Sequence, residues 1–213
     1  MQATVALIGQ KGGSGRTTLA IHLAVEADRA GVPVVLVDTD PQATAALWGQ
    51  WRGKDSTPEV LDCAAPPLLA GKVAALRKAG AQLILIDTPP HANATAVAAA
   101  SIADIILIPV RARAFDLAAA RATADLVKTW KKPAWAVFMS GSPTATTIHA
   151  DAAKVLGVPI APVRLPERAD FHVGLADGQA AQDLAPTGKA AHEVAALWAW
   201  LRTLLTEGEG THG

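Results

Sequence analysis

The chain of 213 residues has a single cysteine, no tyrosine and no long hydrophobic run. Cys63 has no partner for an internal disulfide and cannot form a zinc site alone, so we expect a buried, reduced side chain. A membrane span needs about 18 consecutive apolar residues, and no run reaches that length. The segment Met1–Ile8 lacks the basic region of a signal peptide. These absences predict a cytoplasmic protein.

The chain also lacks an excess of either charge, with 19 basic and 19 acidic residues. Charged residues make up only 18%, against about 25% in an average globular protein. Hydrophobic residues make up 51%, which excludes an intrinsically disordered chain. Because the net charge is zero, the field of the whole molecule gives no reason to expect a polyanionic partner. Any binding of nucleic acid therefore requires a local basic patch.

Short apolar runs alternate with longer alanine-rich segments of helical period. The runs are continuous, which is typical of strands buried on both faces of a parallel sheet. Strands are expected at Val5–Ile8, Val34–Val37, Val60–Cys63, Leu83–Ile86, Ile105–Ile108, Trp135–Phe138 and Val158–Val163. Helices are expected at Thr17–Ala30, Thr44–Trp51, Pro67–Ala79, Asn93–Ser101, Phe115–Trp130, Ile148–Leu156 and Lys189–Leu205.

This alternation predicts an α/β fold, a doubly wound and mostly parallel sheet with helices on both faces. No internal repeat or long linker divides the chain, so we expect one domain over residues 1–206 and a flexible tail over residues 207–213. Ligands of such sheets bind beyond the carboxyl ends of the strands. The residues that follow each strand are therefore the place to look for a site.

A glycine-rich segment follows the first strand and opens the first helix, Gln10-Lys11-Gly12-Gly13-Ser14-Gly15-Arg16-Thr17-Thr18. Its glycines let successive backbone N–H groups face one anion at the positive end of the helix. Thr17 supplies a hydroxyl for Mg²⁺, and a cation at position 16 would reach the β- and γ-phosphates. The general phosphate-loop pattern has Gly at position 10 and Lys at position 16. The alternative is a strand–helix turn without a ligand.

Acidic residues follow two further strands. Asp87 closes an apolar strand, where phosphate-loop proteins place the acid that holds Mg²⁺ through water. Asp38 and Asp40 lie at alternate positions after the second strand, and we assign Asp38 to the Mg²⁺ water shell and Asp40 to the attacking water. The alternative for Asp87 and Asp40 is that each caps the helix that follows it.

These motifs together resemble the ParA/MinD family of deviant-Walker ATPases, with the phosphate-loop NTPase fold. The residues that carry the resemblance are Lys11–Thr18, Asp38-x-Asp40-Pro41-Gln42 and Asp87-Thr88-Pro89-Pro90. It extends over Pro162–Asp177 and Pro186–Ala191 and is closest to short, ParF-like proteins without an N-terminal helix-turn-helix. The resemblance implies that ATP or ADP with Mg²⁺ binds Lys11, Gly12, Gly13, Ser14, Gly15, Arg16, Thr17 and Thr18. It also implies that Lys11 reaches the partner's phosphates in an ATP-dependent homodimer.

Arg16 departs from the family pattern, which has lysine at this position. Arginine keeps the charge but brings a wider planar fork into a close-packed site. The exchange could slow hydrolysis, favour retention of the nucleotide, or have no effect if the guanidinium spans two phosphate oxygens. The sequence leaves these three outcomes open.

The resemblance implies nonspecific DNA binding by the ATP dimer, and one basic patch is a candidate. It consists of Arg111, Arg113, Arg121, Lys128, Lys131 and Lys132, opposed within that window by Asp116 and Asp125 only. If the helix continues that far, Arg121, Lys128 and Lys132 share one face. Asp125 shares it too, so an ion-paired, solvated face is the alternative.

The leading interpretation is a nucleoid-associated partition ATPase that segregates or positions a cargo, stimulated by a ParB-like protein or another cargo adaptor. One alternative is a slowly hydrolysing nucleotide switch, because of Arg16. Another is a MinD-like membrane regulator, but Val194–Leu205 contains Arg202 as its only basic residue, and we expect this helix to cover the core. A metabolic enzyme of the same fold, such as dethiobiotin synthetase, is a further alternative.

Overall fold

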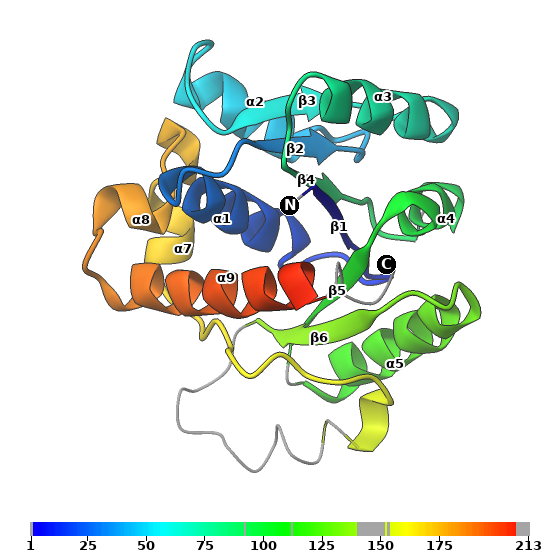
Figure 1. Cartoon of the computed structure of the whole chain (residues 1–213). Helices are drawn as coiled ribbons and strands as arrows, with labels where there is room; N and C mark the ends of the chain where they lie inside the picture. The colour runs from blue at the N-terminus through cyan, green and yellow to red at the C-terminus, as the bar shows by residue number, and fades with distance from the viewer. Residues whose placement is uncertain (1, 92, 112, 140–151, 153, 208–213) are drawn as a thin grey trace.

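The structure, a computed structural model, describes residues 2–91, 93–111, 113–139, 152 and 154–207. Its centre is a sheet with the strand order β3-β2-β4-β1-β5-β6, in which every neighbouring pair is parallel (Figure 1). The strands are β1 (Ala3–Leu7), β2 (Val34–Asp38), β3 (Glu59–Asp62), β4 (Leu83–Asp87), β5 (Ile105–Val110) and β6 (Ala134–Phe138). The predicted α/β fold is confirmed, including the strand expected at Val60–Cys63.

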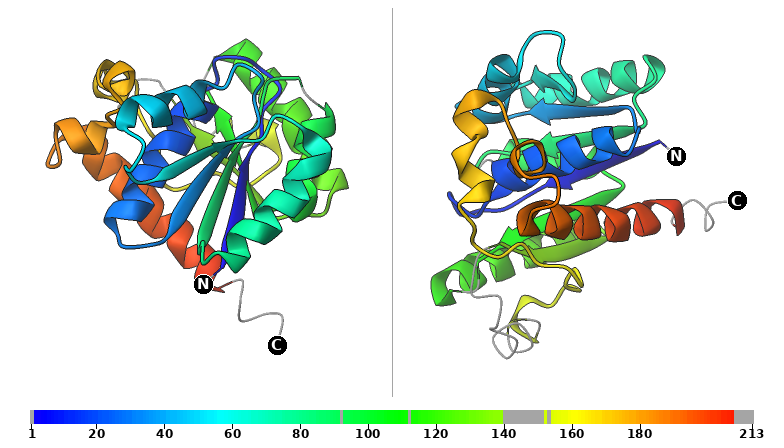
Figure 2. Two further views of the ribbon diagram at one scale, coloured as in Figure 1. Left: turned by 90° about the horizontal axis from the view of Figure 1, so that it is seen from above. Right: turned by 90° about the vertical axis from the view of Figure 1, so that its left-hand side faces the viewer.

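Helices cover both faces of the sheet, as Figure 2 shows. On one face lie α1 (Arg16–Arg29), α2 (Thr44–Arg52) and α9 (Lys189–Glu207), together with the short α7 (Asp170–Val173), η1 (Leu175–Asp177) and α8 (Ala181–Leu184). On the other face lie α3 (Pro66–Lys78), α4 (Asn93–Ile102) and α5 (Ala114–Thr129). Val5 and Leu7 pack into the first layer and Ala6 and Ile8 into the second. Burial on both faces explains why the strands are continuous apolar runs.

The strand order reverses direction at β1, which lies between β4 and β5. In the register of the sheet, Leu7 at the end of β1 is level with Asp87 of β4 and Leu107 of β5. In turn, Asp87 is level with Asp38 of β2. Open parallel sheets bind ligands at the carboxyl ends of the strands beside such a reversal. The fold therefore brings the glycine-rich segment and two of the three candidate acids to one edge.

The prediction of a strand at Val158–Val163 is wrong. This segment runs beside β6 but pairs with it at one isolated parallel bridge, Ala136–Ile160, and a second bridge, Met139–Leu165, joins residues just beyond both. Pro159 and Pro162 have no N–H group to donate to a neighbouring strand, which limits the pairing. The helix expected at Ile148–Leu156 falls largely outside the described residues.

The last helix packs on the core, as expected. Val194, Leu197, Trp198, Leu201 and Leu205 of α9 are buried in the same cluster as α1. None of the described helices is long and apolar enough to cross a membrane. Of the predicted tail, Glu207 is the last residue of α9, and residues 208–213 lie outside the described part of the chain. Cys63 is buried with a free thiol.

Candidate functional site

The glycine-rich segment forms a curled loop between β1 and α1. Gly13 and Gly15 have φ angles of 70° and 95°, a left-handed conformation that residues with a Cβ seldom adopt. Gly15 is the N-cap of α1 and offers no side chain to the first-turn amides. The first backbone bond of the helix runs from the Leu19 N–H to the Gly15 carbonyl at 2.8 Å. The amides before Leu19 have no carbonyl partner within the helix, so the loop can present them to an anion.

Arg16 extends back into this loop and is 7% exposed. Its Nη1 donates to the Gly9 carbonyl, to the Lys11 carbonyl at 2.9 Å and to Ser14 Oγ at 3.4 Å. Its Nε is buried and has no hydrogen-bond partner among the described residues. Burial lowers the pKa of the guanidinium, and the nearby Asp87 opposes that shift. The loop thus holds a cation with donor capacity that the protein itself does not use.

Thr17 and Asp87 meet at the entrance of α1. Thr17 Oγ1 donates to Asp87 Oδ2 at 2.7 Å, whereas Asp87 Oδ1 is buried without a hydrogen-bond partner in the described part of the chain. Burial raises the pKa of Asp87 to about 7, and the adjacent Asp38 adds to this rise, while the Thr17 hydrogen bond and Arg16 oppose it. A hydroxyl and a carboxylate with an unpaired oxygen are hard oxygen donors of the kind that Mg²⁺ prefers. The residues present therefore fit Mg²⁺ bound through Thr17 and Asp87.

Asp38 and Asp40 each bind backbone N–H groups near the start of α2. Asp38 Oδ1 accepts from Asp40 N–H and Oδ2 accepts from Ala46 N–H, both at 3.0 Å. Burial raises the pKa of Asp38, and these backbone hydrogen bonds oppose the rise. Asp40 Oδ1 accepts from Gln42 N–H at 2.9 Å, which closes a local turn. Both residues thus organise this turn, and their assignments to the Mg²⁺ shell and the attacking water stay predictions.

Two threonines that sequence reasoning did not single out connect the strand ends. Thr39 Oγ1 donates to the Asp87 carbonyl at 2.6 Å, and Thr88 Oγ1 donates to the Leu7 carbonyl at 2.7 Å. Each is buried and follows a candidate acid in the sequence. In the sequence, only their positions directly after Asp38 and Asp87 pointed to these two threonines. These bonds fix the spacing of β1, β2 and β4 where the acids lie.

Lys11 forms an ion pair with Asp116 of the same chain. The Lys11 side chain is 45% exposed, whereas Asp116 is buried in the first turn of α5. Two turns along α5, Thr123 Oγ1 accepts from the Gln10 N–H at 3.2 Å. Because β5 lies beside β1, the helix that follows β5 contacts the loop that follows β1. The sequence showed Asp116 only as an opposing charge, and the role of Lys11 across a dimer stays a prediction.

The predicted basic patch is divided by local contacts. Asp125 pairs with Arg121 at 2.8 Å and with Lys128 at 3.4 Å, as the ion-paired alternative expected. Lys132 lies beyond the end of α5 at Thr129, so it does not share a helical face with them, and its Nζ donates to the Ala103 carbonyl. Arg111 is half-buried, whereas Arg113 and Lys131 are exposed. DNA contact by any of the six residues stays a prediction.

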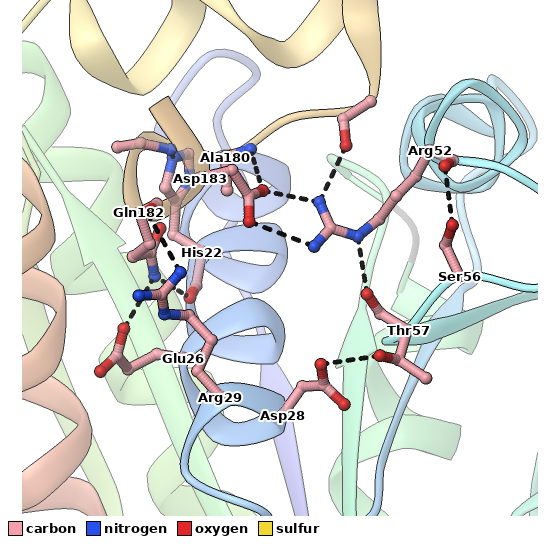
Figure 3. A network of polar contacts seen from close by, with 12 residues as sticks. His22, Glu26, Asp28, Arg29, Arg52, Ser56, Thr57, Ala180, Gln182 and Asp183 are labelled. Carbon is pink, nitrogen blue, oxygen red and sulfur yellow. Dashed lines mark hydrogen bonds and ion pairs between the residues drawn. The ribbon is translucent and has the colours of Figure 1, made fainter. Parts of the chain in front are cut away.

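A network of polar contacts links α1, α2 and α8 (Figure 3). The guanidinium of Arg52 at the end of α2 binds both oxygens of Asp183 in α8, at 2.6 and 3.3 Å. His22 of α1 is fully buried: its Nδ1 lies 2.7 Å from the Thr18 carbonyl, and its Nε2 lies 3.2 Å from the Ala181 amide nitrogen. Burial lowers the pKa of His22 to about 4, so the ring is neutral near pH 7. The network holds α1, which carries Thr17, against α8. It also holds α2, which follows Asp40.

Comparison with known proteins agrees with this geometry. The family model described as "CobQ/CobB/MinD/ParA nucleotide binding domain" matches residues 5–65, which contain the loop, Asp38 and Asp40. The maintenance of carboxysome distribution protein A of Gloeobacter kilaueensis is 38% identical over 116 residues, which are 54% of this chain and 51% of that protein. The chromosome-partitioning ATPase Soj of Thermus thermophilus is 33% identical over 142 residues, 53% of this chain and 56% of that protein.

The chain thus spans about half the length of the curated relatives that it matches. Among solved structures, the septum site-determining protein MinD of Pyrococcus horikoshii, complexed with Mg-ADP, superposes with a TM-score of 0.81 at 19% identity. That match covers 98% of this chain and 99% of the other, and at this identity it establishes the fold. The loop sequence, the acids at the strand ends and the sequence relatives agree, and the chain is similar to the ParA/MinD family over the segment that carries the loop, Asp38 and Asp40.

Proposed function

We propose that the chain is a partition or positioning ATPase that binds ATP with Mg²⁺ in the loop Lys11–Thr18. The observation that carries this proposal is the arrangement at the carboxyl end of β1. There, a loop with two left-handed glycines surrounds the Arg16 guanidinium, and Thr17 donates to the buried Asp87. The structural neighbour from Pyrococcus horikoshii is described as a complex with Mg-ADP, which supports nucleotide binding by this fold.

In this proposal each residue has a distinct task. The loop amides and Arg16 bind the β- and γ-phosphates, and Thr17 and Asp87 hold Mg²⁺, which neutralises phosphate charge when bound. Asp38 belongs to the water shell of the metal, and Asp40 orients the water that attacks the γ-phosphorus. Attack breaks the bond between the γ-phosphorus and its bridging oxygen, giving ADP and inorganic phosphate. Lys11 leaves Asp116 and neutralises phosphate charge on a partner subunit, as an arginine finger does.

The partners of the proposed ATPase follow from its relatives and its surface. The names of the sequence relatives refer to carboxysome distribution and chromosome partitioning, which supports a role in positioning a cargo. We propose an ATP-dependent homodimer on nucleoid DNA, released by a ParB-like or cargo-adaptor protein. The exposed Arg113 and Lys131 are the members of the basic patch that are best placed for DNA. Binding of this kind should weaken steeply with added salt.

A slowly hydrolysing switch is the second candidate, and the contacts of Arg16 favour it. Its Nη1 is held by two main-chain carbonyls, so the guanidinium is less free to follow charge that develops during hydrolysis than an unrestrained lysine. Steady-state hydrolysis by the wild type and by Arg16→Lys separates the candidates. Faster hydrolysis by Arg16→Lys supports the switch. Equal rates support an ATPase whose hydrolysis is not slowed by Arg16.

Sedimentation velocity tests the main proposal. The wild type and Lys11→Ala are compared with ATP, with ADP and without nucleotide, each with and without a nonspecific DNA duplex. The proposal predicts a dimer and DNA retention with ATP only, and loss of both in Lys11→Ala. A wild type that stays monomeric with ATP and does not retain DNA contradicts the partition function and favours a metabolic enzyme of the same fold.

A further inference from the structure

Gly9 is the last residue before the phosphate loop, and space rather than backbone conformation requires a glycine there. Unlike Gly13 and Gly15, it has no positive φ. A Cβ at Gly9 would lie 3.0 Å from Arg16 Nη1, 3.5 Å from Ser14 Oγ and 3.7 Å from Arg16 Cδ. Two of these three contacts are with Arg16. A methyl group at position 9 would therefore press mainly on the arginine.

Arg16 cannot readily move away from such a methyl group. Nη1 is held by the carbonyl of Gly9 itself and by the Lys11 carbonyl at 2.9 Å. Arg16 as a whole is 7% exposed, so the surrounding loop leaves little room for another rotamer. The missing Cβ of Gly9 is what allows the guanidinium to lie this close to the main chain.

We propose that Gly9 is a positioning residue for Arg16, and that Arg16 binds the terminal phosphates of the nucleotide through its Nε–Nη2 edge. This inference rests on the proposed nucleotide binding and adds how the loop accommodates arginine. The Nη1 corner is occupied by main-chain carbonyls, whereas Nε is buried without a partner in the described part of the chain. The Nε–H and one N–H of Nη2 are parallel donors, a geometry that matches two phosphate oxygens.

The two positions should therefore be coupled. The terminal nitrogen of lysine is one bond nearer to Cα than Nη1 of arginine is. Lysine at position 16 therefore leaves room for a Cβ at position 9. Gly9→Ala should displace the fork in the wild type but should be tolerated when position 16 is lysine. If only the backbone conformation required glycine at position 9, Gly9→Ala would have the same effect with arginine and with lysine at position 16.

A double-mutant cycle tests this coupling. The wild type, Gly9→Ala, Arg16→Lys and the double variant are titrated with a fluorescent ATP analogue and Mg²⁺, and their thermal unfolding is measured without nucleotide. Gly71→Ala is the matched control, because a Cβ at Gly71 in α3 meets nothing within 4 Å. We expect Gly9→Ala to weaken binding about tenfold or more when position 16 is arginine, as for loss of one charge-assisted hydrogen bond. In the Arg16→Lys background we expect a change of about twofold or less.

The outcomes separate the inference from the proposed function. Unfolding temperatures without nucleotide should show the same coupling, with Gly9→Ala lowering the value more in the wild-type background than in the Arg16→Lys background. Equal losses in the two backgrounds overturn the positioning role and leave nucleotide binding intact. A wild type that does not bind the analogue overturns the proposed function and the phosphate contact of Arg16, while the unfolding data alone then decide the packing of Gly9 against Arg16.

Discussion

Replacing Asp87 by asparagine should change how the stability of the nucleotide-free protein depends on pH. Asp87 is 1% exposed, and burial raises the pKa of its carboxyl from 3.8 to about 7. Between these values the folded protein holds a proton that the unfolded chain has released, so stability falls as pH rises. At about 1.4 kcal/mol per pKa unit, the whole shift corresponds to about 4 kcal/mol. The Asp87→Asn substitution removes this cost, which is complete above about pH 7 and absent below about pH 4.

Urea unfolding in EDTA measures this effect. Asparagine keeps an acceptor for Thr17 Oγ1, so other consequences of the exchange are common to all pH values. Relative to the wild type, Asp87→Asn should gain about 2–3 kcal/mol between about pH 5 and about pH 8.5. Asp125→Asn is the control, because Arg121 lowers the pKa of the exposed Asp125 instead. A difference between Asp87→Asn and wild type that is the same at both pH values refutes the reasoning.

Two further substitutions test the polar network that links α1, α2 and α8. Burial lowers the pKa of His22 to about 4, so stability gained from the neutral ring rises with pH from about 4 to 6.5. His22→Gln should therefore cost more stability at about pH 7 than near pH 4.5, and an equal cost in urea unfolding contradicts the neutral ring. A Cβ at Gly178, whose φ is 68°, would lie 2.2 Å from the Arg52 amide nitrogen, so Gly178→Ala should cost about 3 kcal/mol or more. Gly31→Ala has a similar φ of 73° with open space and should cost only about 1 kcal/mol; equal thermal shifts would contradict the steric argument.

Much of the fold could be predicted because its strands are buried on both faces. Leu83–Ile86 and Ile105–Ile108 are continuous apolar runs, and each lies within a strand of the sheet. Val158–Val163 is also mainly apolar, but its prolines cannot donate hydrogen bonds to a neighbouring strand. It therefore forms an isolated bridge and not a strand.

The site was predictable where it depends on residues close in sequence. The curled loop, Thr17 and the strand-end position of Asp87 follow from local patterns. The pairing of Lys11 with Asp116 does not, because it depends on β5 lying beside β1. The contact between Gly9 and Arg16 is also hidden, since it depends on the path of one side chain back through the loop.

The central claim is that the loop binds ATP together with Mg²⁺ through Thr17 and Asp87. Isothermal titration of ATP into the wild type and into Thr17→Val, each in Mg²⁺ and in EDTA, tests it most directly. We expect the wild type to bind more tightly in Mg²⁺ than in EDTA, and Thr17→Val to lose that difference because it lacks the hydroxyl that lies beside Asp87. A wild type that releases no heat of binding, or a Thr17→Val variant with an unchanged Mg²⁺ dependence, would contradict the account.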